Sequence, residues 1–515
     1  MRRFLRVLFS RYTISALIIL LYLAALAYFI FYFSIYSLVF FLCAAAVDII
    51  VLIQLINRDI NPEVKLTWLA VLLAVPLFGC ALYVIFSSRS LHRNEARLMK
   101  SVFDTLAADG DEEAIGNSLL RALAEEDSAA AGYALALLKD DALAELYRTE
   151  GARYYPSGEE FFEALTSELR RAKRYVFIET FIISEGKMWD EIHGILKEKV
   201  REGVEVRILY DDIGSMSGVG AHFDKELLRE GIECMRFGRI TPRLVATHNN
   251  RDHRKITVID GRIAFTGGIN VADEYINAKK RFGHWKDGGI SVEGDAVRGF
   301  VRLFLSLWHY TKKDVPVSSK YLLPLKEEER GQGGFVIPYG SGPSPIYPAP
   351  VCKNMLMGII NASQSYVFIT TPYLIIDYDL TEALRGAAAR GVDVRIITPG
   401  IPDKRMINVM TKSAYPRLIE SGVRIFEYSP GFIHEKSIVA DGRIAAVGTV
   451  NLDYRSLIHH YECGVWLAGC PVISDIRDGF LKTIEESCEV TPAAARLSFG
   501  KKIAKNLVRI FAPLM

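Results

Sequence analysis

The chain has 515 residues, a length that predicts two or three domains rather than one small core. Its 62 basic and 60 acidic residues nearly balance, so the composition carries no electrostatic footprint for nucleic acid and excludes it as a partner. The seven cysteines are an odd number and form no Cys-x-x-Cys pair, which excludes a disulfide scaffold and a zinc cluster and weakly favours a reducing compartment.

Residues 1–90 are predicted to form a membrane anchor of two to three apolar segments. Residues 12–56 contain a single formal charge, Asp48, and residues 67–86 contain none. A membrane-spanning helix needs roughly 20 apolar residues, so the first block has room for two spans and the second for one. A cleaved signal peptide, with its shorter apolar core, is a poor fit.

The basic residues that flank these segments predict the orientation. Four arginines lie before residue 12, and Arg89, Arg93, Arg97 and Lys100 follow the last segment. The positive-inside rule places both clusters in the cytoplasm, which three full crossings cannot satisfy. Either one segment is re-entrant, two segments form a single hairpin, or one cluster is overridden. We expect a multi-pass protein of the cell membrane with its catalytic region on the cytoplasmic face.

Residues 91–150 are rich in Ala, Leu, Glu and Asp and are predicted to be a helical connector. Beyond them, helix-like stretches at 159–174 and 188–202 alternate with β-branched runs at 175–183, 204–210 and 255–259. This alternation predicts an α/β fold in which helices flank a mixed sheet.

The same order of segments occurs twice, which predicts a duplicated domain. Residues 175–178 (Tyr-Val-Phe-Ile) recur at 366–369, and Gly203-Val204 recurs as Gly391-Val392 before a similar run. Two copies indicate duplication rather than a solenoid. Residues 326–350, charged and then rich in Gly, Ser and Pro, are the expected linker between domains at 151–325 and 351–490.

A five-residue motif recurs with its spacing intact. His253, Lys255, Asp260, Gly267 and Asn270 each have a counterpart 181 positions later, and the counterparts are His434, Lys436, Asp441, Gly448 and Asn451. One such motif could arise by chance, whereas two at a single offset indicate one site built from two halves. The residue types predict covalent phosphoryl-group chemistry on histidine.

The spacing within the motif predicts its geometry. His and Lys two apart on a strand point to the same face. The strand then ends at Asp-Gly, a hairpin signal, and the return strand brings residues 267–270 or 448–451 beside the pair. We expect Asn270, Asn451 and the backbone at Gly268 and Thr449 to bind phosphate oxygens together with the lysines.

Two pairs of acids are candidates for supporting roles. Asp260 and Asp441 either belong to the catalytic set or cap the hairpin turn. Asp287 and Glu462 lie about one strand and loop beyond their motifs, where each is a candidate to hold the second nitrogen of an imidazole and fix its tautomer.

The last 25 residues, 491–515, are predicted to form a basic amphipathic helix. Ile503, Leu507, Ile510, Phe511 and Leu514 have helical spacing, with Lys501, Lys502, Lys505 and Arg509 on the other side. Such a helix either lies on anionic lipid or packs on the enzyme's own core.

The chain resembles the phospholipase D superfamily, whose members carry two HxK(x4)D(x6)GxxN motifs, and more narrowly the bacterial cardiolipin synthases. The resemblance covers nearly the whole chain, including segments 61–69, 177–183, 210–215, 371–373 and 448–456. It departs after Ser456, where the family typically has Phe and then Asn-Phe-Glu and this chain has Leu457 and then His460-Tyr461-Glu462. Glu462 is kept, so the departure bears on headgroup selectivity rather than on the core reaction.

The resemblance implies a reaction through a phosphohistidine. His253 would be the nucleophile and His434 the general acid and base, or the reverse, and Lys255, Lys436, Asn270 and Asn451 would hold the phosphoryl oxygens. No metal or cofactor is implied, because two lysines supply the positive charge. The substrates implied are membrane phospholipids: one phosphatidylglycerol donates its phosphatidyl group to another, giving cardiolipin and glycerol.

Two alternatives remain at this point. A membrane phospholipase D or phosphodiesterase would use water as the acceptor and release phosphatidic acid; a nuclease is a weaker variant because neither half is basic with interleaved aromatics. A non-catalytic lipid-binding protein would be expected to carry broken motifs, and both motifs are intact.

Overall fold

The structure is a computed structural model that describes residues 20–25, 27–28, 37–58, 60–87, 93–108, 113–149, 151–239, 249–315, 320–323 and 333–495. The chain divides into an N-terminal unit that includes residues 1–88 and a larger unit that includes residues 89–239 and 247–513. The predicted C-terminal amphipathic segment at 501–514 and the arginines before residue 12 lie outside the described residues.

The described part of the N-terminal unit includes α3 (Ser37–Asn57), α4 (Pro62–Ala74) and α5 (Phe78–Phe86), and residues 20–25 and 27–28 are also helical. Asn61 begins α4 by accepting a hydrogen bond from the backbone N–H of Glu63, and Pro62 occupies the first turn, where no donor is needed. A small apolar cluster joins the helices through Leu55, Trp68 and Tyr83. Among the described residues, no helix combines the length and the apolar character needed to cross a membrane. The anchor therefore remains a prediction.

The larger unit opens with three helices, α6 (Arg93–Ala107), α7 (Glu113–Glu126) and α8 (Ser128–Asp140), followed by strand β1 (Tyr147–Thr149). These helices fall within the segment for which a helical connector is predicted.

The first domain is built on a seven-stranded sheet with the order β2-β9-β7-β6-β3-β4-β5. Its strands are β2 (Ala152–Tyr155), β3 (Tyr175–Thr180), β4 (Glu205–Asp211), β5 (Glu233–Phe237), β6 (Ile256–Ile259), β7 (Ile263–Gly267) and β9 (Gly289–Glu293). β3, β4 and β5 are parallel, and the other pairs are antiparallel. This is the mixed sheet that the alternating pattern predicts.

The second domain belongs to a nine-stranded sheet with the order β1-β10-β17-β16-β15-β11-β12-β13-β18. Its strands after β1 are β10 (Gly334–Ser341), β11 (Tyr366–Thr370), β12 (Asp393–Pro399), β13 (Arg424–Tyr428), β15 (Ser437–Ala440), β16 (Ile444–Gly448), β17 (Glu462–Ala468) and β18 (Ser487–Glu489). From β10 to β13 the order repeats that of the first sheet strand for strand. The duplication is therefore present in the topology as well as in the motifs.

Strand β10 lies inside the segment 326–350 that the sequence predicts to be a linker. All eight residues of β10 are buried, and the strand pairs with β17 and β1. In the sheet order β10 corresponds to β2, so part of the expected linker is an edge of the second domain's repeat. Its glycines and Pro338, typical of loops, hide it from a composition-based prediction.

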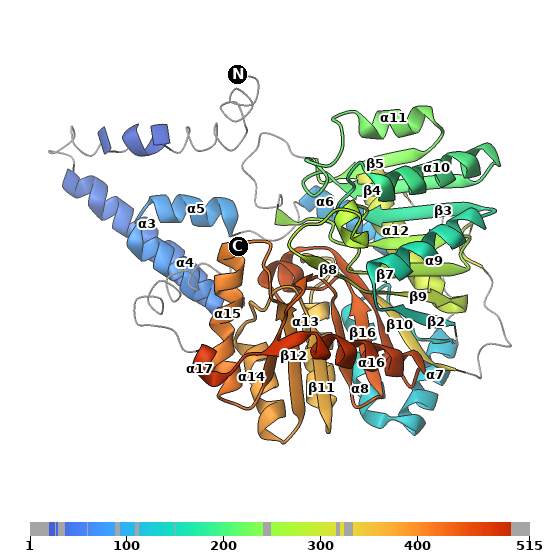
Figure 1. Ribbon diagram of the computed structural model, residues 1–515. Coiled ribbons are helices and arrows are strands. Elements are labelled where there is room, and N and C mark those ends of the chain that lie inside the picture. Colours follow the sequence, from blue (N-terminus) through green and yellow to red (C-terminus); the bar gives the residue numbers. More distant parts are fainter. Residues whose placement is uncertain are drawn as a thin grey trace. The chain divides into compact units, whose positions relative to one another are not determined.

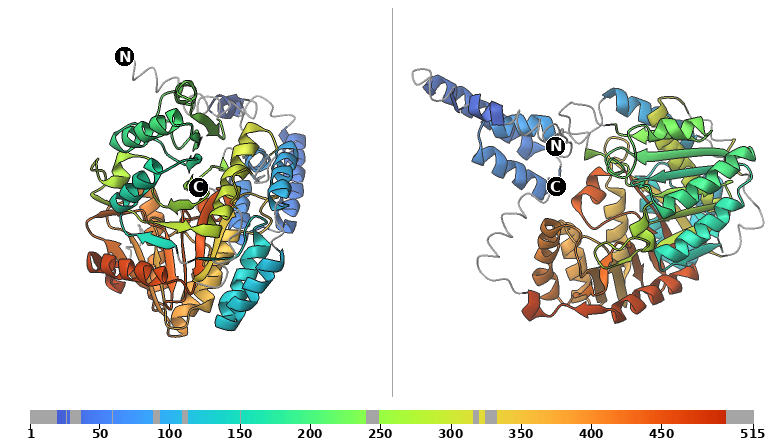
Figure 2. Two further views of the ribbon diagram at one scale, coloured as in Figure 1. Left: turned by 90° about the vertical axis from the view of Figure 1, so that its right-hand side faces the viewer. Right: turned by 45° about the horizontal axis from the view of Figure 1, so that its top comes forward.

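Helices flank both sheets. The first domain contributes α9 (Gly158–Arg170), α10 (Lys187–Arg201), α11 (Phe223–Arg229), η2 (Asp273–Ile276), η3 (Gly294–Ala296) and α12 (Val297–Lys312). The second contributes α13 (Val351–Ala362), α14 (Tyr378–Ala389), α15 (Arg405–Ile419), η5 (Arg455–His459), α16 (Val472–Glu485) and α17 (Pro492–Ala495). Figure 1 shows α9 and α10 beside β3 and β4, and Figure 2 shows the same helices and strands from two further sides. Helix α12 is buried from Val297 to His309 and contacts β5, β6 and β10, so it joins the domains.

A third sheet, of two strands, also joins the domains. Strand β8 (His284–Lys286) of the first domain runs parallel to β14 (Gly431–Ile433) of the second. β14 ends one residue before His434, and β8 ends one residue before Asp287. Residues from both halves of the chain are thus brought to one place.

Candidate active site

Each His-x-Lys motif lies in the segment just before a strand, and its backbone pairs with the other domain. The N–H of His253 donates to the carbonyl of Tyr461 at 2.9 Å, and the N–H of His434 donates to the carbonyl of Lys286 at 2.7 Å. Strands β6 and β15 begin directly after the lysines. The expectation that His and Lys themselves lie on the strand is therefore corrected: an interdomain backbone contact, rather than the hairpin partner, holds the histidine.

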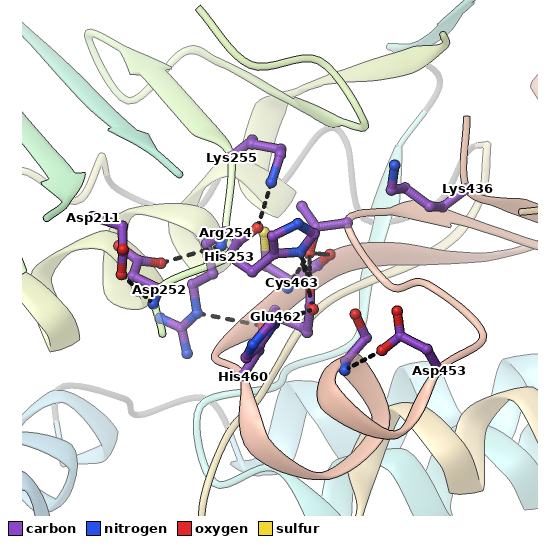
Figure 3. Close-up of polar contacts among 12 residues, drawn as sticks. Asp211, Asp252, His253, Arg254, Lys255, Lys436, Asp453, His460, Glu462 and Cys463 are labelled. Atoms are coloured by element: carbon purple, nitrogen blue, oxygen red, sulfur yellow. Dashed lines mark hydrogen bonds and ion pairs between the residues drawn. The ribbon is translucent and has the colours of Figure 1, made fainter. Parts of the chain in front are cut away.

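The orienting carboxylates are exchanged between the domains. Nδ1 of His253 lies 2.9 Å from Oε2 of Glu462, and Nδ1 of His434 lies 2.8 Å from Oδ2 of Asp287. Glu462 belongs to the second domain and Asp287 to the first. Figure 3 shows the contact between His253 and Glu462. Each domain thus supplies the imidazole of one dyad and the carboxylate of the other.

The two lysines make matching contacts. Nζ of Lys255 donates to the carbonyl of His253 at 2.7 Å, and Nζ of Lys436 donates to the carbonyl of His434 and also lies 2.8 Å from its Nδ1. Burial is the main cause that lowers the pKa of Lys255 to about 8 and that of Lys436 to about 7. Two partly desolvated ammonium groups in one site favour an anionic ligand, which would restore their usual pKa.

The histidines are held neutral. Burial, followed by the charge of the neighbouring lysine, lowers the pKa of His253 well below its usual value and that of His434 to about 4. Lys436 and His434 are among the groups that act on His253, so the two halves share one electrostatic environment. A bound phosphodiester anion would oppose both shifts and allow one imidazole to carry a proton.

The two carboxylates differ from each other. Burial raises the pKa of Glu462 to about 8, despite the charge of Lys255. Burial also acts on Asp287, but His434 and Lys436 outweigh it and lower the pKa of that carboxyl. The dyads are therefore alike in geometry and unlike in the proton affinity of the carboxylate.

The contacts of Asp260 and Asp441 match the alternative in which each acid caps its hairpin turn. Asp260 accepts hydrogen bonds from the backbone N–H groups of Lys173, Arg174 and Tyr175 at 2.7–3.0 Å, and Asp441 accepts from those of residues 364–366 at 2.8 Å. Both have positive φ, 57° and 54°, in the hairpin turn. The turn lies at the far end of β6 or β15 from the histidine. These contacts favour the capping alternative for both acids, and a catalytic role for them stays a prediction.

Gly268 and Thr449 contact the carboxylates rather than open space. A Cβ atom on Gly268 would lie 2.0 Å from Oδ1 of Asp287 and 2.7 Å from the carbonyl of His434. The hydroxyl of Thr449, at the equivalent position, donates to Oε2 of Glu462. The structure thus places both expected phosphate-binding residues against the orienting acids.

The two asparagines differ in how much of their amide is engaged. Oδ1 of Asn270 accepts from the N–H of Ile182 at 3.0 Å, and its Nδ2 donates to the hydroxyl of Tyr275 at 2.7 Å. Oδ1 of Asn451 is buried and has no hydrogen-bond partner within the described part of the chain. The free oxygen of Asn451 is an acceptor, so it suits a donor such as a hydroxyl rather than a phosphoryl oxygen.

The middle residues of the two motifs were missed by sequence reasoning, and both join the domains. The fully buried guanidinium of Arg254 donates to the carbonyls of Leu303 and Glu462 and to the hydroxyl of Tyr347. Glu435 accepts from the hydroxyl of Tyr154 at 2.6 Å and from Nζ of Lys286 at 2.9 Å. Figure 3 shows Arg254 beside His253 and Glu462. The sequence signal that could have found them is the charged residue between His and Lys in each motif.

Asp211 supports the first motif and was also missed. It forms an ion pair with Arg251 at 2.8 Å and accepts from the backbone N–H of Asp252 at 3.0 Å. Both contacts fix the residues that lead into His253. The signal was an acid at the end of a buried strand.

A third imidazole adjoins the first dyad. The rings of His253 and His460 are 5.6 Å apart, and Nδ1 of His460 lies 3.8 Å from Oε1 of Glu462. Among the described residues, His253, His460 and Glu462 are the group with metal-ligating atoms close together, all within 4.8 Å. Lys255 and Lys436 place positive charge in the same site, which opposes a cation there.

Two α/β domains meet at paired His-Lys motifs, as the resemblance to the phospholipase D (PLD) superfamily predicts. Comparisons with known proteins agree with this arrangement. A family model described as "Cardiolipin synthase, PLD-like domain" matches residues 165–280 and 356–484, and one described as "Phospholipase_D-nuclease N-terminal" matches residues 46–87. The crystal structure of a phosphatidylserine synthase from Haemophilus influenzae has the same fold, with a TM-score of 0.54 and 15% identity over 72% of this chain and 95% of that one.

Sequence relatives extend over nearly the whole chain. A cardiolipin synthase of Alkalihalophilus pseudofirmus is 31% identical over 485 residues, which are 93% of this chain and 93% of that protein. An uncharacterized protein of Streptococcus mutans is 38% identical over 472 residues, 90% of this chain and 99% of that protein. The chain belongs to the cardiolipin synthase family, and it is a phosphatidyltransferase.

Proposed function

We propose that the enzyme transfers a phosphatidyl group from one phosphatidylglycerol to a second one, giving cardiolipin and glycerol. The observation that carries this proposal is the exchanged pair of dyads, His253 with Glu462 and His434 with Asp287. Two imidazoles, each oriented by an acid, suit a reaction in which one forms a bond to phosphorus and the other moves a proton.

The reaction has two displacements. Nε2 of His253 attacks phosphorus, and the bond from phosphorus to the glycerol oxygen breaks as His434 gives that oxygen a proton. Glycerol leaves, and the phosphatidyl group stays on His253. A hydroxyl of the second phosphatidylglycerol then gives its proton to His434 and attacks phosphorus, and the N–P bond breaks. The exchange of roles between the histidines is the alternative that the matching geometry leaves open.

The remaining polar groups suit the phosphoryl oxygens. Lys255 and Lys436 are cationic donors, and an anionic partner would raise the pKa values that burial lowers and so keep both lysines charged at neutral pH. Nδ2 of Asn451 and of Asn270 are further donors in the same motifs. Fixed donors aimed at the developing charge stabilise the five-coordinate transition state.

The N-terminal unit suits association with a membrane. It leaves large apolar side chains exposed, among them Ile53, Ile56, Leu66, Leu73 and Val84. An exposed apolar surface of this kind marks a membrane or protein partner. Since donor, acceptor and product all have acyl chains, we propose that this unit keeps the enzyme on the bilayer, as a multi-pass anchor with the catalytic domains on the cytoplasmic face.

The test is a lipid assay with the full-length enzyme in vesicles that contain phosphatidylglycerol. We expect cardiolipin and free glycerol in equal amounts, measured by mass spectrometry and by release of labelled glycerol. Phosphatidic acid as the lipid product, with no cardiolipin, would show that water is the acceptor and would replace transfer by hydrolysis. His253→Asn is the matched inactive control.

A further inference from the structure

Exposed basic and apolar side chains lie in the loop after β12, at the start of helix α15 and in the segment before β8, and we call them the rim surface. Ile401, Met406 and Val409 are large apolar residues with 41%, 58% and 48% of their area exposed. Lys404 and Arg405 lie between them in sequence and are exposed, and Lys280 is exposed on the first-domain side. The rim surface consists of Lys280, Ile401, Lys404, Arg405, Met406 and Val409.

The rim surface is fixed to the catalytic strands by backbone contacts. The N–H of Ile401 donates to the carbonyl of Gly431 at 3.1 Å, and Gly431 pairs with Gly283 in an antiparallel bridge. Lys280 lies three residues before Gly283, and His434 lies three residues after Gly431. Both domains therefore contribute to a surface that is a few residues from the catalytic imidazole.

A row of aromatic rings leads from the rim surface to that imidazole. The hydroxyl of Tyr373 donates to Asp403, the neighbour of Lys404, at 2.7 Å. The ring of Tyr373 is 6.5 Å from that of Phe432, which is 5.9 Å from that of His434. These rings form a continuous row of packed side chains between the rim surface and the site.

Helix α15 is anchored next to the second motif. Met410, one turn after Met406, is buried and packs against Tyr454, which follows Asn451 in that motif. Met406 and Val409 are three residues apart, so they share a face of the helix. Asp403 is the acid at the start of this segment, and Tyr373 and Lys404 already contact it. The rim surface is thus basic and apolar at once.

We propose that the rim surface docks on an anionic phospholipid bilayer, with Met406 and Val409 inserted among the acyl chains and the cations on the headgroups. This combination is the one that binds interfaces containing anionic lipid. Docking there would hold the site close to the bilayer while the acyl chains of a bound lipid stay in the membrane. The inference rests on the proposed function only in taking membrane lipids as substrates.

Site-specific fluorescence of the full-length enzyme in phosphatidylglycerol vesicles tests the proposal. We would compare Met406→Trp with Leu228→Trp, an exposed position on α11, and subtract the signal of the five native tryptophans using the unsubstituted enzyme. We expect lipids with brominated acyl chains to quench the added emission of Met406→Trp at least about twofold more than that of the control variant. Equal quenching in the two variants would overturn the proposal.

The same variants would show whether something other than a bilayer covers the rim surface. A blue shift of the added emission without vesicles that depends on protein concentration would assign the surface to a second copy of the chain. A shift without vesicles that is independent of concentration would assign it to the enzyme's own C-terminal residues. Either result, without quenching by brominated lipid, overturns bilayer docking. Because quenching reports position, it is independent of which lipid product the enzyme makes.

A kinetic experiment complements the fluorescence. We expect Met406→Asp/Val409→Asp to lower the rate on phosphatidylglycerol in vesicles about tenfold or more. The same variant should keep the wild-type rate on a short-chain phosphatidylglycerol that is monomeric in solution. Equal losses on both substrates would mean that the substitutions damage the catalytic domain, and equal retention would mean that the surface is not used.

Discussion

Glu462 of the second domain holds Nδ1 of His253 of the first at 2.9 Å, and the opposite pair, Asp287 and His434, is joined at 2.8 Å. Neither domain contains a complete dyad. Duplication of a domain in one chain therefore has a direct chemical consequence, because a single copy would have an imidazole without its acid.

A substrate that needs no general acid can show which of the two histidines is the nucleophile. A phosphatidyl ester of p-nitrophenol has a good leaving group, so formation of the phosphohistidine from it requires the nucleophile alone. We expect His434→Asn to release about one equivalent of nitrophenol per enzyme and then stop, and His253→Asn to release none above background. Rapid-mixing absorbance measures both. A burst in His253→Asn and none in His434→Asn would exchange the two roles.

Each carboxylate is expected to affect the catalytic step of the histidine that it contacts in the other domain. We expect Glu462→Gln to slow the nitrophenol burst by about 10³-fold or more, because the glutamine NH2 can face Nδ1 of His253 as a donor and favour the wrong tautomer. Asp287→Asn should preserve the burst and slow the later turnover, in which His434 acts as a base. The same rapid-mixing assay compares them. If each acid affected the step of the histidine in its own domain, the crossed geometry would be wrong.

Much of this organisation could be predicted from sequence, because a repeated motif reports both the chemistry and the duplication. The exchange of Asp287 and Glu462 could not, since both acids follow their own motifs along the chain and only the tertiary structure carries them across. The strand pattern likewise hid β10, where Pro338 interrupts the β-branched signal. Arg254 and Glu435 could not be assigned for a third reason. They lie within the motifs, but they join the two domains, and the sequence does not show how the domains pack.

The lysines predict an alkaline limit to catalysis. An ammonium is present below its pKa and lost above it, and burial lowers the pKa of Lys436 to about 7 and that of Lys255 to about 8 in the free enzyme. We therefore expect kcat/KM for phosphatidylglycerol to fall as pH rises through 7–8, because kcat/KM reports the free enzyme. Glycerol release at subsaturating substrate measures this.

Lys436→Arg is the matched variant for that profile. Arginine keeps its proton through the whole range, so the alkaline fall should move to higher pH even if the maximum rate is lower. Identical alkaline limbs in the wild type and the variant would show that Lys436 does not set the limit.

Gly268 is expected to tolerate no side chain. In Gly268→Ala the new Cβ would lie 2.0 Å from Oδ1 of Asp287, so the carboxylate must move away from His434. We expect turnover to fall about 10²-fold or more, with circular dichroism unchanged. Gly194→Ala, on α10 with nothing within 4 Å of the added atom, is the control and should keep full activity. Equal activities of the two variants would mean that Asp287 is free to adjust.

Substitution of Asp260 or Asp441 is expected to lower the stability of the fold and to change turnover little, although both motifs also contain the catalytic residues. Asp260 accepts three backbone hydrogen bonds with its carboxylate, and asparagine has one acceptor oxygen in place of two. We expect Asp260→Asn to lower the free energy of unfolding by about 1.5–3 kcal/mol, the range for hydrogen bonds to a charged group. Turnover per folded enzyme should change less than about threefold, because the turn is at the far end of β6 from His253. Thermal unfolding and initial rates measured on the same preparation check both parts, and a large loss of turnover at unchanged stability would return Asp260 to the catalytic set.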